Sequence, residues 1–165
     1  MIPRAARFGI AAVVAVLDRL SKYWIETNLT PWDSHPIIPG VFNIVNTQNR
    51  GAAFGVLATA DGHWRQFFLV GVSLAVMIFV AVQLWRMPKG SWPASNMVAV
   101  PLSLMLGGAL GNLYDRIFRG SVTDFLQVFL GSYEWPSFNV ADSAISVGAV
   151  LLLASFWLPA PRTGE

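Results

Sequence analysis

Apolar positions along this 165-residue chain gather into four long runs instead of alternating with polar positions. A helix that crosses a bilayer needs about 20 mostly apolar residues, within a range of roughly 17–25. The runs predict four such helices, over residues 8–25, 67–85, 97–114 and 140–158. We therefore expect an all-α membrane protein, with one integral-membrane domain spanning residues 1–165.

The first of these runs is apolar only in its first half. Its second half carries Asp18, Arg19 and Lys22, so we expect that part of the helix to face protein or water, or to emerge from the bilayer. The basic start followed by an apolar run resembles a secretory signal, but no small-residue cleavage site follows it. We interpret this segment as a retained first membrane helix.

Two longer segments connect the predicted helices, over residues 27–66 and 117–139. The first contains three prolines between residues 31 and 39, followed by a stretch rich in β-branched and aromatic residues, Val41–Thr47. That composition predicts short strands. The second contains aromatic residues typical of a membrane–water boundary. We expect these segments to form a small extracytoplasmic cap that contains β structure.

Basic residues in the short connections predict the orientation. Arg4 and Arg7 precede the first run, Arg86 and Lys89 separate the second and third, and Arg162 follows the fourth. Lysine and arginine accumulate on the cytoplasmic side of membrane proteins. Both termini are therefore expected to be cytoplasmic.

Composition supports lipid as the surrounding solvent. Apolar residues make up 55% of the chain and charged residues 12%, against roughly 45–50% and about 25% in soluble domains. The net charge of +2 is too small to favour a nucleic-acid partner. The absence of cysteine excludes disulfides, thiolate nucleophiles and cysteine-ligated metals.

Most other catalytic chemistries also lack their residues. The two histidines, His35 and His63, lie in the first connecting segment and outside any HExxH motif. No Gly-x-Ser-x-Gly elbow is present. A serine–lysine pair formed by Ser21 and Lys22 remains an alternative. We predict no metal and no cofactor.

Carboxylates in apolar surroundings are the strongest chemical signal. Asp18, Asp124 and Asp142 each interrupt an apolar stretch, and a carboxylate at membrane depth usually has a functional or pairing reason. Two carboxylates brought together share a proton, so that one deprotonates water while the other polarises a peptide carbonyl. The alternative is that Asp124 and Asp142 are structural, one of them at a helix N-terminus.

Other polar residues suggest supporting roles. Asp18 and Lys22 are four residues apart and are expected to pair across one helical turn. The adjacent Asp115 and Arg116 do not face each other on a helix, so each either has a partner elsewhere or, for Arg116, binds a lipid head group. Amide side chains such as Asn112 and Asn139 either orient carboxylates or substrate, or cap and join helices.

Small residues indicate two close approaches of the backbone. Gly107, Gly108 and Gly111 form a small-residue face that predicts tight helix packing. The segment Asn49–Gly51 is expected to form a turn that places Asn49 near a substrate channel.

Four sequence blocks together resemble a known family. They are LDRLSK (residues 17–22), NRGAAFG (49–55), GGALGNLYDRIFRGSVTDF (107–125) and FNVADSAISVG (138–148). Through them the chain resembles the lipoprotein signal peptidases, also called signal peptidase II, over nearly its whole length. The third and fourth blocks are the most specific.

This resemblance implies a monomeric aspartyl endopeptidase of the bacterial inner membrane, with four helices and a periplasmic cap. Its partners would be membrane lipids and the signal peptides of lipid-modified prolipoproteins, which it would cleave N-terminal to a diacylglyceryl-modified cysteine. The catalytic pair would be Asp124 and Asp142. The substrate-binding or supporting residues would be Asn49, Gly51, Asn112, Arg116, Asn139, Asp18, Lys22 and Asp115.

One residue departs from the pattern expected of the family. Thr123 stands where a second valine is expected before Asp124. Threonine is nearly isosteric with valine, so we expect the site to persist. Its hydroxyl adds a hydrogen bond that would shift the pKa of a carboxylate.

Two other functions compete with the peptidase. A small proton-coupled transporter would also use buried carboxylates, but it needs them along a continuous aqueous path, and the run at 67–85 contains none. A non-catalytic assembly or chaperone subunit would place no demand on a pair of aspartates.

Overall fold

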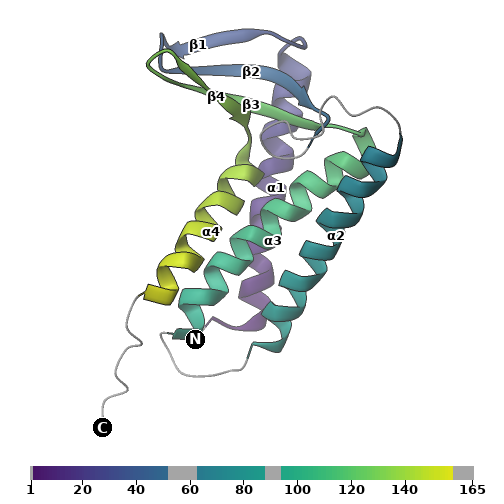
Figure 1. Ribbon diagram of the computed structural model, residues 1–165, viewed down its shortest axis with the longest axis vertical. Helices are drawn as coiled ribbons and strands as arrows, with labels where there is room; N and C mark the ends of the chain where they lie inside the picture. Colours follow the sequence, from purple (N-terminus) through teal and green to yellow (C-terminus); the bar gives the residue numbers. More distant parts are fainter. Residues whose placement is uncertain (1, 52–62, 88–93, 158–165) are drawn as a thin grey trace.

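The computed structural model describes residues 2–51, 63–87 and 94–157, which form four helices and one sheet (Figure 1). The helices run side by side and the sheet lies across one end of them. At the other end α1 begins and α4 ends. In chain order the elements are α1 (Arg4–Asn28), β1 (Ser34–Ile38), β2 (Phe42–Asn49), α2 (His63–Arg86), α3 (Ala94–Arg119), β3 (Val122–Leu130), β4 (Tyr133–Phe138) and α4 (Val140–Trp157).

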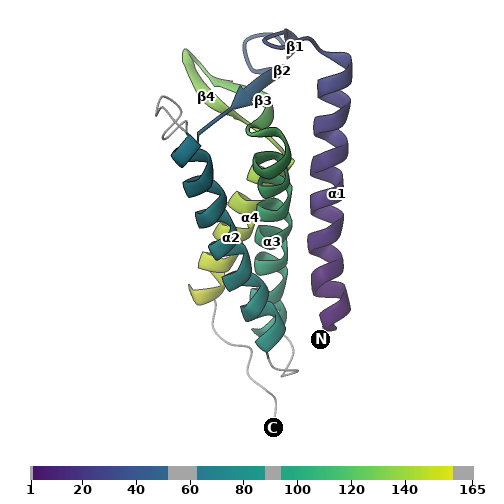
Figure 2. The same ribbon diagram turned by 90° about the vertical axis from the view of Figure 1, so that its right-hand side faces the viewer.

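Helix α3 is the centre of the bundle and packs against the other three helices (Figure 2). Its glycines allow this. A Cβ atom on Gly107 would lie 2.6 Å from the carbonyl oxygen of Ala11 in α1, and one on Gly108 would meet the carbonyl oxygen of Ala141 in α4. The predicted small-residue face is confirmed, because it lets two neighbouring backbones approach α3 closely.

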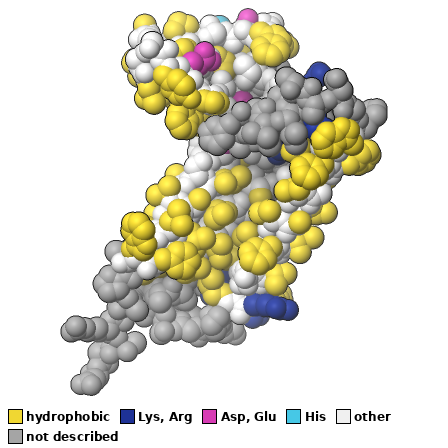
Figure 3. All heavy atoms as spheres, viewed as in Figure 1, with side chains coloured by type: hydrophobic (Ala, Val, Ile, Leu, Met, Phe, Trp, Pro, Cys, Tyr) yellow, Lys and Arg dark blue, Asp and Glu magenta, His cyan; other side chains and the backbone are white. Residues whose placement is uncertain are grey.

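Three of the described helices are long and apolar enough to cross a membrane, over Trp64–Arg86, Met97–Arg119 and Val140–Trp157. The side chains visible over the helices in Figure 3 are largely hydrophobic. Large apolar side chains exposed on the helices include Phe67, Phe68, Phe79, Val150, Leu153 and Phe156. The outward faces therefore suit lipid.

Helix α1 differs because its charges point inward. Arg7, Asp18 and Lys22 are all buried, whereas Val13 and Leu20 are more than half exposed. The Arg7 guanidinium donates to the carbonyl oxygen of Leu84 at 3.2 Å, which satisfies the C-terminal end of α2. Of the alternatives predicted for the charged half of this helix, the structure shows the one in which Asp18 and Lys22 face protein.

The sheet is antiparallel, with strand order β1-β2-β3-β4. The strands predicted at Val41–Thr47 are confirmed as β2. The β structure predicted for the connecting segments is confirmed, and residues 122–138 contribute two strands that the sequence pattern did not locate. That apolar stretch carries no local hairpin signal toward its partner β2, which lies about 80 residues earlier in the chain.

Helix α3 also runs five residues beyond its predicted end at residue 114, as far as Arg119. Its last five residues include the charged Asp115, Arg116 and Arg119, which end the apolar run without ending the helix. Gly120 ends the helix with a φ of 75°, and its N–H donates to the carbonyl oxygen of Asp115 at 3.1 Å. Asp115 and Arg116 are consequently helical residues close to the sheet.

Candidate active site

Asp142 is the third residue of α4 and belongs to a capping box. The Asn139 side-chain oxygen accepts from the Asp142 N–H at 2.9 Å, and the Asp142 carboxylate accepts from the Asn139 N–H at 3.3 Å. This reciprocal pair satisfies two backbone donors at the start of the helix. The carboxylate also lies at the positive end of the helix dipole.

Asp124 reaches the same place from the sheet. Val122 and Asp124 both line the cavity below the sheet, as the two-residue period of a strand requires. The Asp124 carboxylate accepts from the Asn139 amide at 2.7 Å and from the Asn49 amide at 3.1 Å. Asn139 therefore contacts both aspartates and connects them.

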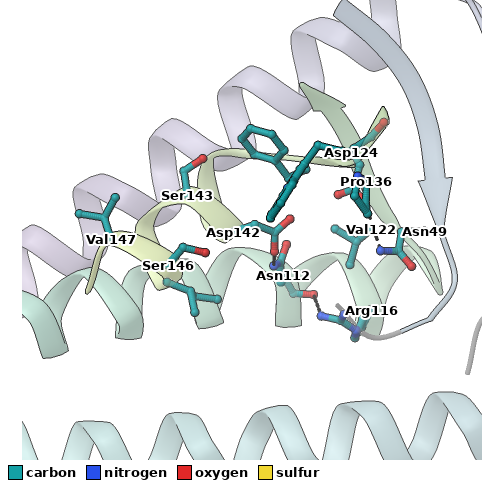
Figure 4. A pocket seen from close by; sticks show the side chains of 14 residues that line it. Asn49, Asn112, Arg116, Val122, Asp124, Pro136, Asp142, Ser143, Ser146 and Val147 are labelled. Carbon is teal, nitrogen blue, oxygen red and sulfur yellow. Dashed lines mark hydrogen bonds between the residues drawn. The ribbon is translucent and has the colours of Figure 1, made fainter. Parts of the chain in front are cut away.

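The two aspartates face one cavity of about 450 Å³ (Figure 4). Its walls come from α3, α4, β3, β4 and the end of β2. The close-up shows Asp142 held by Asn112, and Asp124 by Asn49, on either side of the opening. The structure thus brings together the two carboxylates that the sequence separates by 18 positions.

The Asn112 side chain has only one orientation that satisfies its neighbours. Its oxygen accepts from the Lys22 ammonium at 2.9 Å and from the Asn139 amide at 3.3 Å. Lysine has donors only, so the amide oxygen must face it. The Asn112 nitrogen is thereby directed at the Asp142 carboxylate, to which it donates at 2.8 Å.

The surroundings of Asp124 change its acidity. Burial and, to a lesser extent, the nearby charge of Asp142 together raise the pKa of Asp124 to about 7, against the hydrogen bonds from Asn49 and Asn139, which lower it. A carboxyl group with this pKa holds a proton in an appreciable fraction of molecules near neutral pH. Asp124 is therefore able to donate a proton near neutral pH.

A second group of charges lies behind the cavity, between α1 and α3. The Lys22 ammonium pairs with Asp18 at 2.7 Å, as predicted, and with Asp115 at 2.8 Å. Asp18 also accepts from the N–H of Ala141 at 2.8 Å, which ties α1 to the start of α4. These three charged residues do not line the cavity but support the elements that do.

Arg116 lines the cavity and does not pair with its neighbour Asp115. Its guanidinium donates to the carbonyl oxygens of Asn112 at 3.4 Å and Gly51 at 3.3 Å. The Gly51 N–H in turn donates to the Asn49 side chain at 2.9 Å, which confirms the predicted turn. All ten predicted site residues consequently lie in or directly behind the cavity.

Sequence reasoning assigned no role to Arg19 and Glu26, which pair at 2.6 Å. Their spacing of seven residues, two helical turns, was the available signal. The added hydrogen bond predicted for Thr123 exists, but its hydroxyl donates to Glu26 at 2.7 Å and not to either cavity aspartate.

Solved structures identify the class of the fold. A protein described as a bacterial membrane enzyme matches with a TM-score of 0.80 and 29% identity, covering 98% of this chain and 93% of that one. A second one matches with a TM-score of 0.79 and 29% identity, over 94% and 95%. The fold is that of a multi-pass bacterial membrane enzyme, with helices and a small antiparallel sheet.

Sequence comparison identifies the family. The family described as signal peptidase (SPase) II matches residues 10–158. A lipoprotein signal peptidase of Solibacter usitatus (strain Ellin6076) is 44% identical, covering 92% of this chain and 90% of its own. That of Nitratidesulfovibrio vulgaris (strain DP4) is 41% identical, over 95% and 93%. The chain belongs to the signal peptidase II family, which confirms the resemblance drawn from the four blocks.

Proposed function

We propose that this protein removes signal peptides from bacterial prolipoproteins by an aspartyl mechanism, cleaving N-terminal to a diacylglyceryl-modified cysteine. Family membership supports the substrate class. The observation that carries the mechanism is the placement of Asp124 and Asp142 on one cavity, joined through Asn139. The transporter alternative has no support from the comparisons.

Asp142 acts as the general base in this proposal. Its carboxylate accepts from the Asn112 amide and from the Asn139 backbone, and it sits at a helix N-terminus. The carboxylate takes a proton from a water molecule whose oxygen attacks the scissile carbonyl carbon.

Asp124 acts as the general acid. Its pKa of about 7 keeps a proton available at neutral pH, and that proton is donated toward the carbonyl oxygen as negative charge develops there. When the tetrahedral intermediate collapses, Asp142 passes its proton to the leaving nitrogen. Asp124 regains its proton as the carbonyl re-forms, so the pair returns to its starting state.

The cavity wall suits an extended apolar substrate. Trp135 and Phe138 line it on one side, and Ile145 and Val147 on the α4 side. Such a wall accommodates the apolar residues of a signal peptide and a lipid-modified side chain. Arg116 completes the polar end, next to the residues that orient Asp142.

We further propose that α1 is a fourth membrane span, so that one domain covers residues 1–165. Its charges are satisfied internally, by Lys22 with two aspartates and by Arg7 with the end of α2. The outward face left to lipid is apolar. Both termini then lie in the cytoplasm, and the sheet and active site lie on the periplasmic side of the inner membrane. A monomeric state remains a prediction.

The test is cleavage of a diacylglyceryl-modified prolipoprotein in detergent. The natural protein is compared with its Asp124→Asn and Asp142→Asn forms, and Asp33→Asn serves as the matched control. Asp33 is a partly buried residue of the cap that accepts a hydrogen bond from Thr30 and does not line the cavity. Each active-site change should reduce turnover by at least about 10³-fold, because no residual acid–base pair remains.

Turnover should be unchanged in Asp33→Asn and insensitive to chelators and to serine reagents in the natural protein. Survival of activity in either active-site variant would disprove the aspartyl mechanism. Failure of a well-folded natural protein to cleave would withdraw the proposed activity and leave the membrane fold intact.

A further inference from the structure

Strand β3 presents different residues to its two faces around Asp124. Val122 and Asp124 line the active-site cavity. Phe125 lines a separate groove beside α1, together with Trp24 and Ile25. Thr123 is completely buried and its hydroxyl bonds to Glu26 of α1, so it also belongs to the α1 face. The direction of Asp124 therefore depends on the register of β3 against α1.

The backbone hydrogen bonds between the strands do not by themselves fix the register of β3 in this region. The pairing of β2 with β3 is irregular between Ile44 and Thr47, just beyond the partner of Asp124. The pairing of β3 with β4 is irregular between Leu126 and Val128. Bulges of this kind bend a strand and disrupt its ladder locally. Asp124 thus lies next to irregularities on both edges of its strand.

A side-chain anchor is present at this position. The Glu26 carboxylate accepts from the Thr123 hydroxyl at 2.7 Å, from Arg19 at 2.6 Å and from Arg119 at 2.6 Å. The side chain of Glu26 is only 10% exposed. The Thr123 hydroxyl also accepts from the Gln48 amide of β2 at 3.1 Å. One carboxylate thereby joins α1, the last residue of α3 and the middle of the sheet.

We infer that Glu26 and Thr123 form an anchor that positions Asp124, by fixing β3 against α1 so that the carboxyl group faces the cavity. Neither residue touches the reacting atoms, so both are positioning residues. The inference rests on the proposed peptidase function. It also gives a role to the threonine that stands where the family pattern led us to expect valine.

Thr123→Val tests the anchor with little change of shape, because valine lacks only the hydroxyl. A displacement of reacting groups by 1 Å is able to cost about 10²-fold, and the loss of one anchor should move Asp124 by less. We therefore expect kcat to fall roughly tenfold. KM should stay within about twofold, because the apolar wall that binds the substrate is unchanged.

Two further variants separate positioning from general damage. Thr123→Ser keeps the hydroxyl and should recover most of the lost kcat. Thr27→Val makes the same chemical change one residue from Glu26, where the exposed hydroxyl bonds only within its own helix turn, to two carbonyl oxygens and to the Asn28 amide. It should leave kcat unchanged. Thermal unfolding in detergent confirms that each variant is folded.

A double-mutant cycle identifies Glu26 as the partner. Glu26→Met removes the acceptor at similar length, and Arg19 and Arg119 are exposed enough to be hydrated without it. If the anchor is shared, adding Thr123→Val to Glu26→Met should lower kcat by less than about twofold more.

Independent, multiplicative losses in the double variant would overturn the anchor, as would a natural kcat in Thr123→Val. The parent activity keeps these outcomes distinct from failure of the proposed function. If the natural protein cleaves and Asp124→Asn does not, the peptidase stands whichever way Thr123→Val behaves.

Discussion

Two pairs of carboxylates, one from α1 and α3 and the other from β3 and α4, have opposite surroundings. Asp18 and Asp115 share the ammonium of Lys22, at 2.7 and 2.8 Å. Asp124 and Asp142 accept instead from neutral side-chain amides and backbone. Among the residues that the structure describes, neither of them has an ion-pair partner.

This contrast distinguishes the carboxylates that support the fold from those proposed to carry out the reaction. A carboxylate paired with a buried cation holds together the elements that carry the two groups. A carboxylate surrounded by neutral donors and by a second carboxylate keeps the freedom to gain and lose a proton. Buried acids as such do not indicate a catalytic site; the kind of neighbour distinguishes the catalytic pair from the structural pair.

The largest effect is expected where the structural pair loses its cation. Lys22→Met leaves Asp18 and Asp115 buried without their shared ammonium, and breaking a buried ion pair costs about 3–5 kcal/mol. The free energy of unfolding, from denaturant titration in mixed micelles, should fall by this amount. Arg86→Met is the control, since Arg86 is exposed at the end of α2 far from the sheet. Equal stability of the two variants would contradict the assignment of Lys22 as a structural cation.

The next effect comes from giving the catalytic pair a cation. Asn49→Lys places an ammonium beside Asp124, and an opposite charge at such distance lowers a carboxyl pKa by about 1–3 units. The fall of kcat/KM with rising pH should shift downward by the same interval. Asn49→Met loses the same hydrogen bonds at similar length without charge, and should show no downward shift. A shared shift would attribute the change to the lost amide and not to the charge.

A smaller effect concerns the packing that holds both groups. Gly108→Ala directs a methyl group at the carbonyl oxygen of Ala141 and at Ile145, and overpacking of this kind costs about 1–3 kcal/mol. Gly71→Ala is the matched control, because a Cβ there meets nothing within 4 Å. Thermal unfolding in detergent should show a lower midpoint only for the former. A midpoint for Gly108→Ala at or above that of the natural protein would refute the close contact of α3 and α4.

The smallest effect needs no substitution. Activity requires Asp124 protonated and Asp142 ionised, and the raised pKa of about 7 means that Asp124 loses its proton as pH rises through neutrality. Above pH 7 the value of kcat/KM should therefore fall, approaching about tenfold per pH unit. A flat or rising profile between pH 7 and 9 would remove Asp124 from the role of acid.

Much of the candidate site could be predicted because its parts are local. The spacing of Asp18 and Lys22 predicted their ion pair, and the small residues at 107–111 predicted close helix contact. The signature blocks located Asp124 and Asp142. The partners of Asp115 and Thr123 could not be predicted, because they lie on α1, almost 100 residues earlier in the chain.

The fold likewise has parts that local sequence predicts and parts that depend on distant residues. Long apolar runs located the helices, while β3 was missed because a strand is stabilised by its partners and β2 is distant in sequence. The end of α3 was placed five residues early because three of its last five residues are charged, so the apolar run ends before the helix does.

The sequence by itself determined the membrane class, the approximate helices and the residues available for chemistry, since hydropathy and residue type are properties of short segments. Only the tertiary structure decided which buried carboxylates receive a cation and which receive amides. That choice depends on which side chains meet across α1, α3, α4 and the sheet. Charge pairing falls steeply with distance inside a protein, so a carboxyl group becomes structural or reactive according to neighbours that the linear sequence does not place beside it.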